Sequence, residues 1–132
     1  MRLLADTSAL IALSLSADRD HRRATEFLAR APAARFVVSD LILSELATRL
    51  AVRAGARRAA EVARGLLASR RYEVLFSDAG LLHEALALLE KFEDKRLSLT
   101  DCASFALMTK LGIDAAFSFD ADFRDCGFAM VP

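Results

Sequence analysis

Apolar and polar positions follow one another along this chain in short blocks of two kinds. Unbroken apolar runs, such as residues 3–5 and 36–38, are typical of strands buried on both faces of a parallel sheet. Longer blocks with apolar residues three or four positions apart, such as Ile42, Leu46 and Leu50, indicate helices. In chain order these patterns predict strands near residues 2–5, 36–38, 73–76, 115–118 and 128–131, with helices near 9–13, 18–31, 41–54, 56–69, 78–91 and 99–111.

Local signals set the expected element boundaries. Thr7 or Ser8 is the candidate N-cap of the first helix, and Ser39 and Asp40 together mark the start of the third helix. Gly112 is expected to end the helix at 99–111, which carries no charge between its ends and should be the most buried one. Residues 120–125 are expected to form a charged turn, and the strand at 73–76 to lie at a sheet edge.

The regular alternation of strands and helices predicts the fold class. We expect one α/β domain over residues 1–132, with three layers and a central, mostly parallel sheet. Over half of the 132 residues are apolar, yet no apolar run approaches the length of a membrane span. We also see no signal peptide, and the two cysteines follow no metal-ligand spacing. These features favour a cytoplasmic protein with no membrane partner.

A formal net charge of zero hides two oppositely charged regions. Residues 19–71 contain 12 arginines and 5 acids, whereas residues 72–132 contain 5 basic residues and 11 acids. Arginine is the side chain best suited to phosphate, so we regard Arg49, Arg53, Arg57 and Arg58 as candidates for binding the phosphates of a ligand. The alternative is that these arginines simply cover solvated helix faces.

Five acidic residues from four separate segments are expected at one edge of the sheet. Asp6 ends the first strand, Glu45 lies one turn into the helix after the second strand, and Asp101 lies in the first turn of the buried helix. Asp120 and Asp122 follow the strand at 115–118. Because parallel strands end at the same edge, and open α/β sheets place ligands there, these acids are candidates for one common site.

Each acid also has a purely structural explanation. Asp101 fits the third helical position of a capping box that begins at Ser98, and Glu45 could pair with Arg49 one helical turn later. Asp120 and Asp122 could be ordinary turn formers. Asp6 is the hardest to explain in this way, because a carboxylate among so many apolar residues should be buried.

Electrostatics predicts what such a cluster needs. Two carboxylates about 4 Å apart repel by roughly 4 kcal/mol at an effective dielectric constant of about 20, so several together must take up protons or bind a cation. The candidate ligands are all oxygens, and His21 and His83 lie far from the acidic motifs, which favours Mg²⁺ or Mn²⁺ over Zn²⁺. The matching chemistry is hydrolysis of a phosphodiester by metal-activated water.

Four segments, taken together and in order, resemble the signatures of the PIN domain family. They are Leu-Ala-Asp-Thr-Ser-Ala-Leu at 4–10, Ser-Glu-Leu at 44–46, Leu-Thr-Asp-Cys at 99–102 and Ser-Phe-Asp-Ala-Asp-Phe at 118–123. The short chain is similar to VapC-type toxins of toxin–antitoxin pairs. This resemblance implies a PIN-like α/β/α fold and a Mg²⁺- or Mn²⁺-dependent endoribonuclease that leaves a 5′-phosphate and a 3′-hydroxyl. It also implies a homodimer inhibited by a small VapB-like antitoxin.

The resemblance also implies roles for individual residues. Asp6, Glu45 and Asp101 match the first three acidic positions, and Asp120 is the better match to the fourth, with Asp122 as its alternative. We expect Asp6, Asp101 and Asp120 to bind one metal ion, while Glu45 binds a second ion or orients the attacking water. Neighbouring hydroxyls are expected to orient these ligands, namely Thr7, Ser8, Thr100 and Ser118.

Three other functions remain as alternatives. A housekeeping PIN nuclease in RNA processing would share the same acids, and a non-catalytic PIN-fold binding protein would have lost some of them. A phosphoaspartyl phosphatase would require an acid two residues after Asp6, where this chain has Ser8, and a late basic residue, whereas no lysine follows Lys110.

Overall fold

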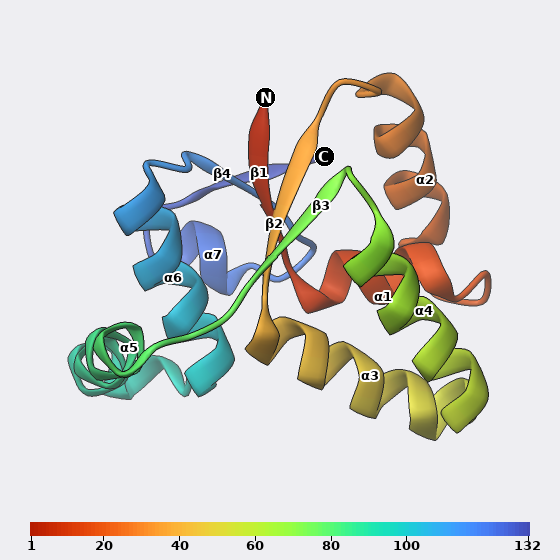
Figure 1. Ribbon diagram of the computed structural model, residues 1–132. Coiled ribbons are helices and arrows are strands. Elements are labelled where there is room, and N and C mark those ends of the chain that lie inside the picture. Colours follow the sequence, from red (N-terminus) through yellow and green to blue (C-terminus); the bar gives the residue numbers. More distant parts are fainter.

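A single five-stranded sheet forms the centre of the computed structural model, which describes residues 1–132 (Figure 1). The strand order is β3-β2-β1-β4-β5, and every neighbouring pair is parallel. The strands are β1 (Arg2–Ala5), β2 (Arg35–Ser39), β3 (Tyr72–Leu75), β4 (Ala115–Phe117) and β5 (Ala129–Val131). The expected strands are therefore confirmed, and β3 lies at an edge as predicted.

Helices cover the sheet on both sides and complete the three layers. They are α1 (Thr7–Ser14), α2 (His21–Arg30), α3 (Asp40–Ala54), α4 (Ala56–Ala68), α5 (Ala79–Lys91), α6 (Leu99–Leu111) and α7 (Asp122–Asp125), with a 3₁₀ turn at Glu93–Lys95. Helices α5 and α6 lie on one side of the strands, and α1, α2 and α4 on the other (Figure 1). None of these helices combines the length and apolar character that crossing a membrane requires. The expected fold class is confirmed.

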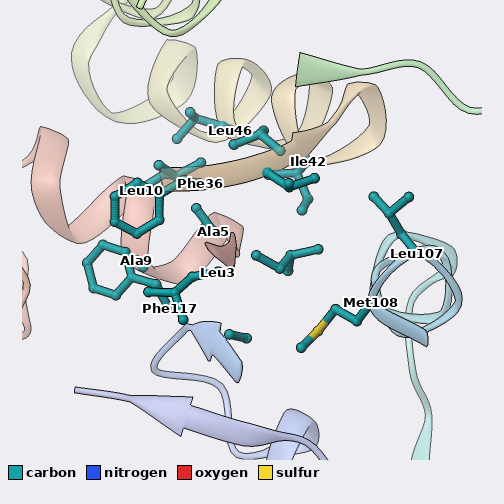
Figure 2. Close-up of a cluster of buried hydrophobic side chains, with 14 of the residues drawn as sticks. Leu3, Ala5, Ala9, Leu10, Phe36, Ile42, Leu46, Leu107, Met108 and Phe117 are labelled. Atoms are coloured by element: carbon teal, nitrogen blue, oxygen red, sulfur yellow. The ribbon is translucent and has the colours of Figure 1, made fainter. Parts of the chain in front are cut away.

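The core explains why the strand sequences are continuously apolar. Leu3, Leu4 and Ala5 of β1 are all buried, because helices cover both faces of the central strand. Figure 2 shows Met108 projecting from α6 toward the strands. Every residue of α6 from 102 to 108 is buried. The expectation that α6 is the most buried helix is nevertheless wrong, because five of the eight residues of α1 are buried and none is exposed, whereas both ends of α6 reach solvent.

Two local expectations were wrong at the ends of β1 and β4. The N-cap of α1 is Asp6, whose side chain accepts from the Ser8 N–H, and not Thr7 or Ser8. Residues 122–125 form the short helix α7 within the expected charged turn. In both places an aspartate side chain bonds a backbone N–H two residues later, which makes aspartate itself the organising residue.

The strand order creates a switch point between β1 and β4. From β1 the chain proceeds to β2 and β3 on one side, and it then returns to place β4 and β5 on the other side of β1. The chain therefore leaves these two adjacent strands in opposite directions, which opens a crevice at their carboxyl ends. Asp6 follows β1 and Ser118 follows β4, so both lie at this crevice.

Candidate metal centre

Asp6 is a buried carboxylate held by hydroxyl groups. Only 4% of its surface is exposed, and its Oδ2 accepts hydrogen bonds from the Ser8 N–H at 3.3 Å, the Ser8 hydroxyl at 2.8 Å and the Ser118 hydroxyl at 3.0 Å. Burial nevertheless raises the pKa of Asp6, against the lowering effect of these hydrogen bonds. All three bonds end on one oxygen, so Oδ1 accepts none of them.

The same hydroxyls fasten the loop after β4 to Asp6. The Ser8 Oγ accepts from the Phe119 N–H at 2.9 Å, and the Ser118 Oγ accepts from the Asp120 N–H at 3.0 Å. The Asp120 Oδ1 in turn accepts from the Asp122 N–H at 3.0 Å. This chain of hydrogen bonds links Asp6 to Asp120 and Asp122 although they lie more than a hundred residues away in sequence.

Asp101 forms the capping box of α6 and also faces the other acids. Its N–H donates to the Ser98 Oγ at 3.0 Å, and its Oδ2 accepts from the Ser98 N–H at 3.3 Å. The pKa of Asp101 is raised to about 6, mainly by burial, then by the Asp6 carboxylate and to a smaller extent by Asp120. The capping-box explanation is therefore correct for Oδ2 of Asp101, while the negative charge of its carboxylate still interacts with those of Asp6 and Asp120.

Three carboxylates meet closely enough to share a cation. One oxygen from each of Asp101, Asp120 and Asp122 lies within 4.8 Å of the other two, and all three residues are partly buried. Two ligands of one Mg²⁺ lie at most about 4.2 Å apart, so a small closure around an ion would complete the contact. The residues present therefore fit a hard divalent cation. Asp120 and Asp122 both belong to the group, whereas Asp6 does not.

Glu45 has a different partner. Its carboxylate forms an ion pair with Arg49 at 3.0 Å on the same face of α3, and it does not belong to the three-carboxylate group. About 24% of its side chain is exposed, so the group remains reachable from solvent. The ion pair between Glu45 and Arg49, one helical turn apart, is therefore present, as the structural explanation of Glu45 predicted.

The expected hydroxyl partners divide into two pairs. Ser8 and Ser118 donate to Asp6, whereas the hydroxyl of Thr7 is buried without any hydrogen-bond partner. The hydroxyl of Thr100 makes no hydrogen bond to a carboxylate, although the backbone carbonyl of Thr100 accepts one from Ser104. Of the two hydroxyls that follow Asp6, Ser8 is therefore the one that bonds it, while Thr7 is only 1% exposed.

A groove of about 1290 Å³ leads away from Asp120. We call it the main groove; its walls come from α1, the α1–α2 loop, the second half of α3 and residues 119–121. Arg49 and Arg53 line it, and Arg53 lies 3.9 Å from Asp18. Arg57 and Arg58 are exposed further along, at the start of α4, where Arg58 pairs with Glu61 at 3.5 Å.

Two contributors near the cluster were not predicted from the sequence. Lys95 is half-buried. The pKa of Asp122 is raised, first by burial and then by the Asp120 and Asp125 carboxylates, and the Lys95 ammonium opposes this rise. The backbone N–H of Phe119 fixes the Ser8 hydroxyl. Lys95 lies in a charged connection of mixed sign, where no sequence signal separates it from its neighbours.

A parallel sheet with carboxylates gathered at its switch point defines an α/β domain that can hold a cation at its strand ends. The sequence model of the PIN domain family matches residues 3–129. The chain therefore belongs to the PIN domain family. Its expected family membership is confirmed.

Named relatives and solved structures agree with this assignment. The 23S rRNA-specific endonuclease VapC20 of Mycobacterium tuberculosis is 34% identical over 129 residues, covering 98% of this chain and 97% of the relative. Ribonuclease VapC26 of the same organism is 30% identical over 105 residues, covering 80% of this chain and 76% of the relative. The crystal structure of VapC20, described as a sarcin–ricin loop cleaving toxin, superposes with a TM-score of 0.90 at 33% identity, covering 96% of each chain.

Two more distant structures share the fold. VapBC2 from Rickettsia felis, bound to a promoter DNA fragment, has a TM-score of 0.68 at 13% identity and covers 98% of this chain and 97% of its own. A toxin–antitoxin complex from Klebsiella pneumoniae has a TM-score of 0.68 at 18% identity, with 98% and 96% covered. At these identities the likeness concerns the fold alone.

Removing the Ser118 hydroxyl should weaken metal binding without unfolding the protein. Ser118→Ala removes a donor to Asp6 and the acceptor that fixes the Asp120 N–H, so we expect Mn²⁺ affinity to fall by about 10- to 100-fold. Ser118→Thr keeps the hydroxyl and should retain most of the affinity. Isothermal titration calorimetry with Mn²⁺ measures both, and Ser104→Ala is the control for loss of a buried serine hydroxyl. Equal affinities for all four proteins would contradict the role of Ser118.

The metal-free protein should lose stability as the pH rises through the pKa of Asp101. Since that pKa is about 6 in the folded protein and 3.8 as a reference, the folded state holds more protons between these values, and its stability falls with rising pH. Partial exposure reduces the loss to on the order of 1 kcal/mol. Asp101→Asn keeps an oxygen for the Ser98 N–H and should be more stable than wild type at about pH 7. Urea unfolding in chelator at about pH 4.5 and about pH 7 tests this; an equally steep loss in the variant would refute it.

Proposed function

We propose that this chain is a VapC-type toxin, a ribonuclease that hydrolyses RNA phosphodiesters with a divalent metal ion at the carboxylate cluster. One observation carries the proposal. In a PIN-family chain, Asp101, Asp120 and Asp122 present oxygens within 4.8 Å of one another, beside the buried Asp6 at the switch point of the sheet. The full-length similarity to VapC20 supports the same function.

The residues of this chain divide the work at the site. Asp101, Asp120 and Asp122 hold the ion, with Asp6 as a further ligand through its Oδ1 or through water. All-oxygen ligands favour Mg²⁺ or Mn²⁺. When bound, the ion lowers the pKa of water and neutralises charge on the phosphate. Glu45 orients the attacking water or binds a second ion, and the ion pair with Arg49 positions its carboxylate.

RNA enters through the main groove. Arg49 and Arg53 line that groove, which Asp120 also lines. Phosphates of the RNA strand replace Glu45 as the partner of Arg49 and Asp18 as the partner of Arg53. Arg57 and Arg58 extend the positive surface at the start of α4. The relative VapC20 is named for its action on 23S rRNA, which makes the sarcin–ricin loop of that RNA the first substrate to test.

A small VapB-like antitoxin is the proposed inhibitor, and the working form is a cytoplasmic homodimer. Two of the solved structures with this fold are named as VapBC or toxin–antitoxin assemblies. A housekeeping RNA-processing nuclease would use the same cluster, and a reading frame for a small antitoxin beside this one would favour the toxin. A non-catalytic binding role is disfavoured because every expected acidic position is filled.

Neutralising a metal ligand should abolish cleavage while the fold persists. We expect Asp6→Asn and Asp101→Asn to lower the rate of Mn²⁺-dependent cleavage of a sarcin–ricin loop RNA by at least about a hundredfold. The measurement is gel-resolved cleavage of end-labelled RNA in Mn²⁺ and in chelator, with circular dichroism as the test of folding.

The matched control is Asp114→Asn, which removes an exposed carboxylate just before β4. This variant should cleave at the wild-type rate. If a folded Asp6→Asn or Asp101→Asn protein cleaves RNA as fast as wild type, the proposed site is wrong. Cleavage of unrelated RNA but not of the sarcin–ricin loop would keep the nuclease and reject the substrate.

A further inference from the structure

A second groove, of about 490 Å³, begins at the same loop as the catalytic cluster. Arg23 from α2 and Arg124 from α7 line it together with Ser118, Phe119, Phe128 and Met130. Phe119 and Ala121 line both this second groove and the main groove. Asp120 lies between those two residues in sequence, so both grooves adjoin the loop that carries Asp120.

We propose that the second groove binds a nucleotide of the RNA strand next to the cleaved phosphate, with Arg124 and Arg23 at its phosphate and Phe119 and Met130 against its base. This inference rests on the proposed ribonuclease function. An RNA strand whose scissile phosphate lies at the cluster must leave the site in two directions. The main groove receives one side of the strand, and the second groove receives the other.

The charges of the second groove are available to an anion. Arg124 is exposed and forms no ion pair, not even with Asp122 or Asp125 on its own helix. Arg23 pairs only loosely with Asp20, at 3.5 Å, and 60% of its side chain is exposed. In the main groove, by contrast, Arg49 is 3.0 Å from Glu45. Arg124, two residues after Asp122 in sequence, therefore offers an exposed guanidinium without a partner to the phosphate of a nucleotide bound in this groove.

The apolar part of the groove suits a base. The Arg23 guanidinium lies 5.1 Å from the centroid of the Phe119 ring, an arrangement that holds the ring in place and offers a planar cation beside it. Aromatic rings and guanidinium planes are the usual stacking surfaces for unpaired RNA bases, and they accept any base. The volume is also within the range of small-ligand sites, about 300–1,000 Å³.

Arg124→Gln tests the subsite, because the residue is exposed and its loss should not disturb the fold. We expect the Kd for a fluorescein-labelled sarcin–ricin loop RNA, measured by anisotropy in the Asp101→Asn background, to rise roughly five- to tenfold. The slope of log Kd against log salt should fall by about 0.7, the signature of one lost phosphate contact with a single strand. In the active enzyme the loss should appear in KM.

The matched control is Arg64→Gln, which removes the same charge from an exposed, unpaired position on α4, beside the opposite edge of the sheet. It should bind RNA as wild type does. Arg124→Glu should weaken binding more than Arg124→Gln. If Arg124→Gln and Arg64→Gln bind RNA with equal affinity and equal salt slope, the subsite is overturned, whatever their affinity for an antitoxin.

Binding is measured separately from cleavage, so the two proposals fail in different ways. Equal binding by both variants, with intact wild-type cleavage, would reject the subsite and keep the ribonuclease. Weaker binding by Arg124→Gln, with no metal-dependent cleavage by wild type, would reject the ribonuclease and keep the RNA subsite.

Discussion

Repulsion between carboxylates is the constraint on which this structure depends. Like charges about 4 Å apart cost roughly 4 kcal/mol at an effective dielectric constant of about 20, a large amount for a marginally stable domain. The chain keeps Asp6, Asp101 and Asp120 in place by fixing one oxygen of each with a serine or a backbone N–H. The other oxygen of each accepts none of these bonds. This division is suited to a site that is complete only with a cation.

The sheet topology explains why acids so distant in sequence can meet. Because β4 is inserted beside β1 after the chain has built β2 and β3, the ends of β1 and β4 are neighbours although they lie over a hundred residues apart. Ser8 and Ser118 join these ends by bonding the same Asp6 oxygen. The loop that follows Ser118 carries Asp120, and its residues Phe119 and Ala121 line both grooves. The proposed metal site and the proposed RNA path thus share one short segment.

Much of this could be predicted from the sequence because burial leaves a strong pattern. Strands covered on both faces must be apolar throughout, and a helix enclosed by other elements loses its charges, as α6 does. Which partner a polar side chain bonds depends on how the elements pack in the folded protein, and the sequence pattern does not show this. The sequence could not decide whether Thr7 or Ser8 would bond Asp6, because a one-residue rotation about the helix axis separates core from crevice. The pairing of Glu45 was open for the same reason.

The most direct test is a crystal structure of the protein grown with Mn²⁺, with anomalous scattering recorded at the manganese edge. The account predicts a strong anomalous peak bonded to carboxylate oxygens of Asp101, Asp120 and Asp122, and its loss in Asp101→Asn crystals grown in the same way. Crystals with no peak among these three side chains, or with one that persists in the variant, would contradict it.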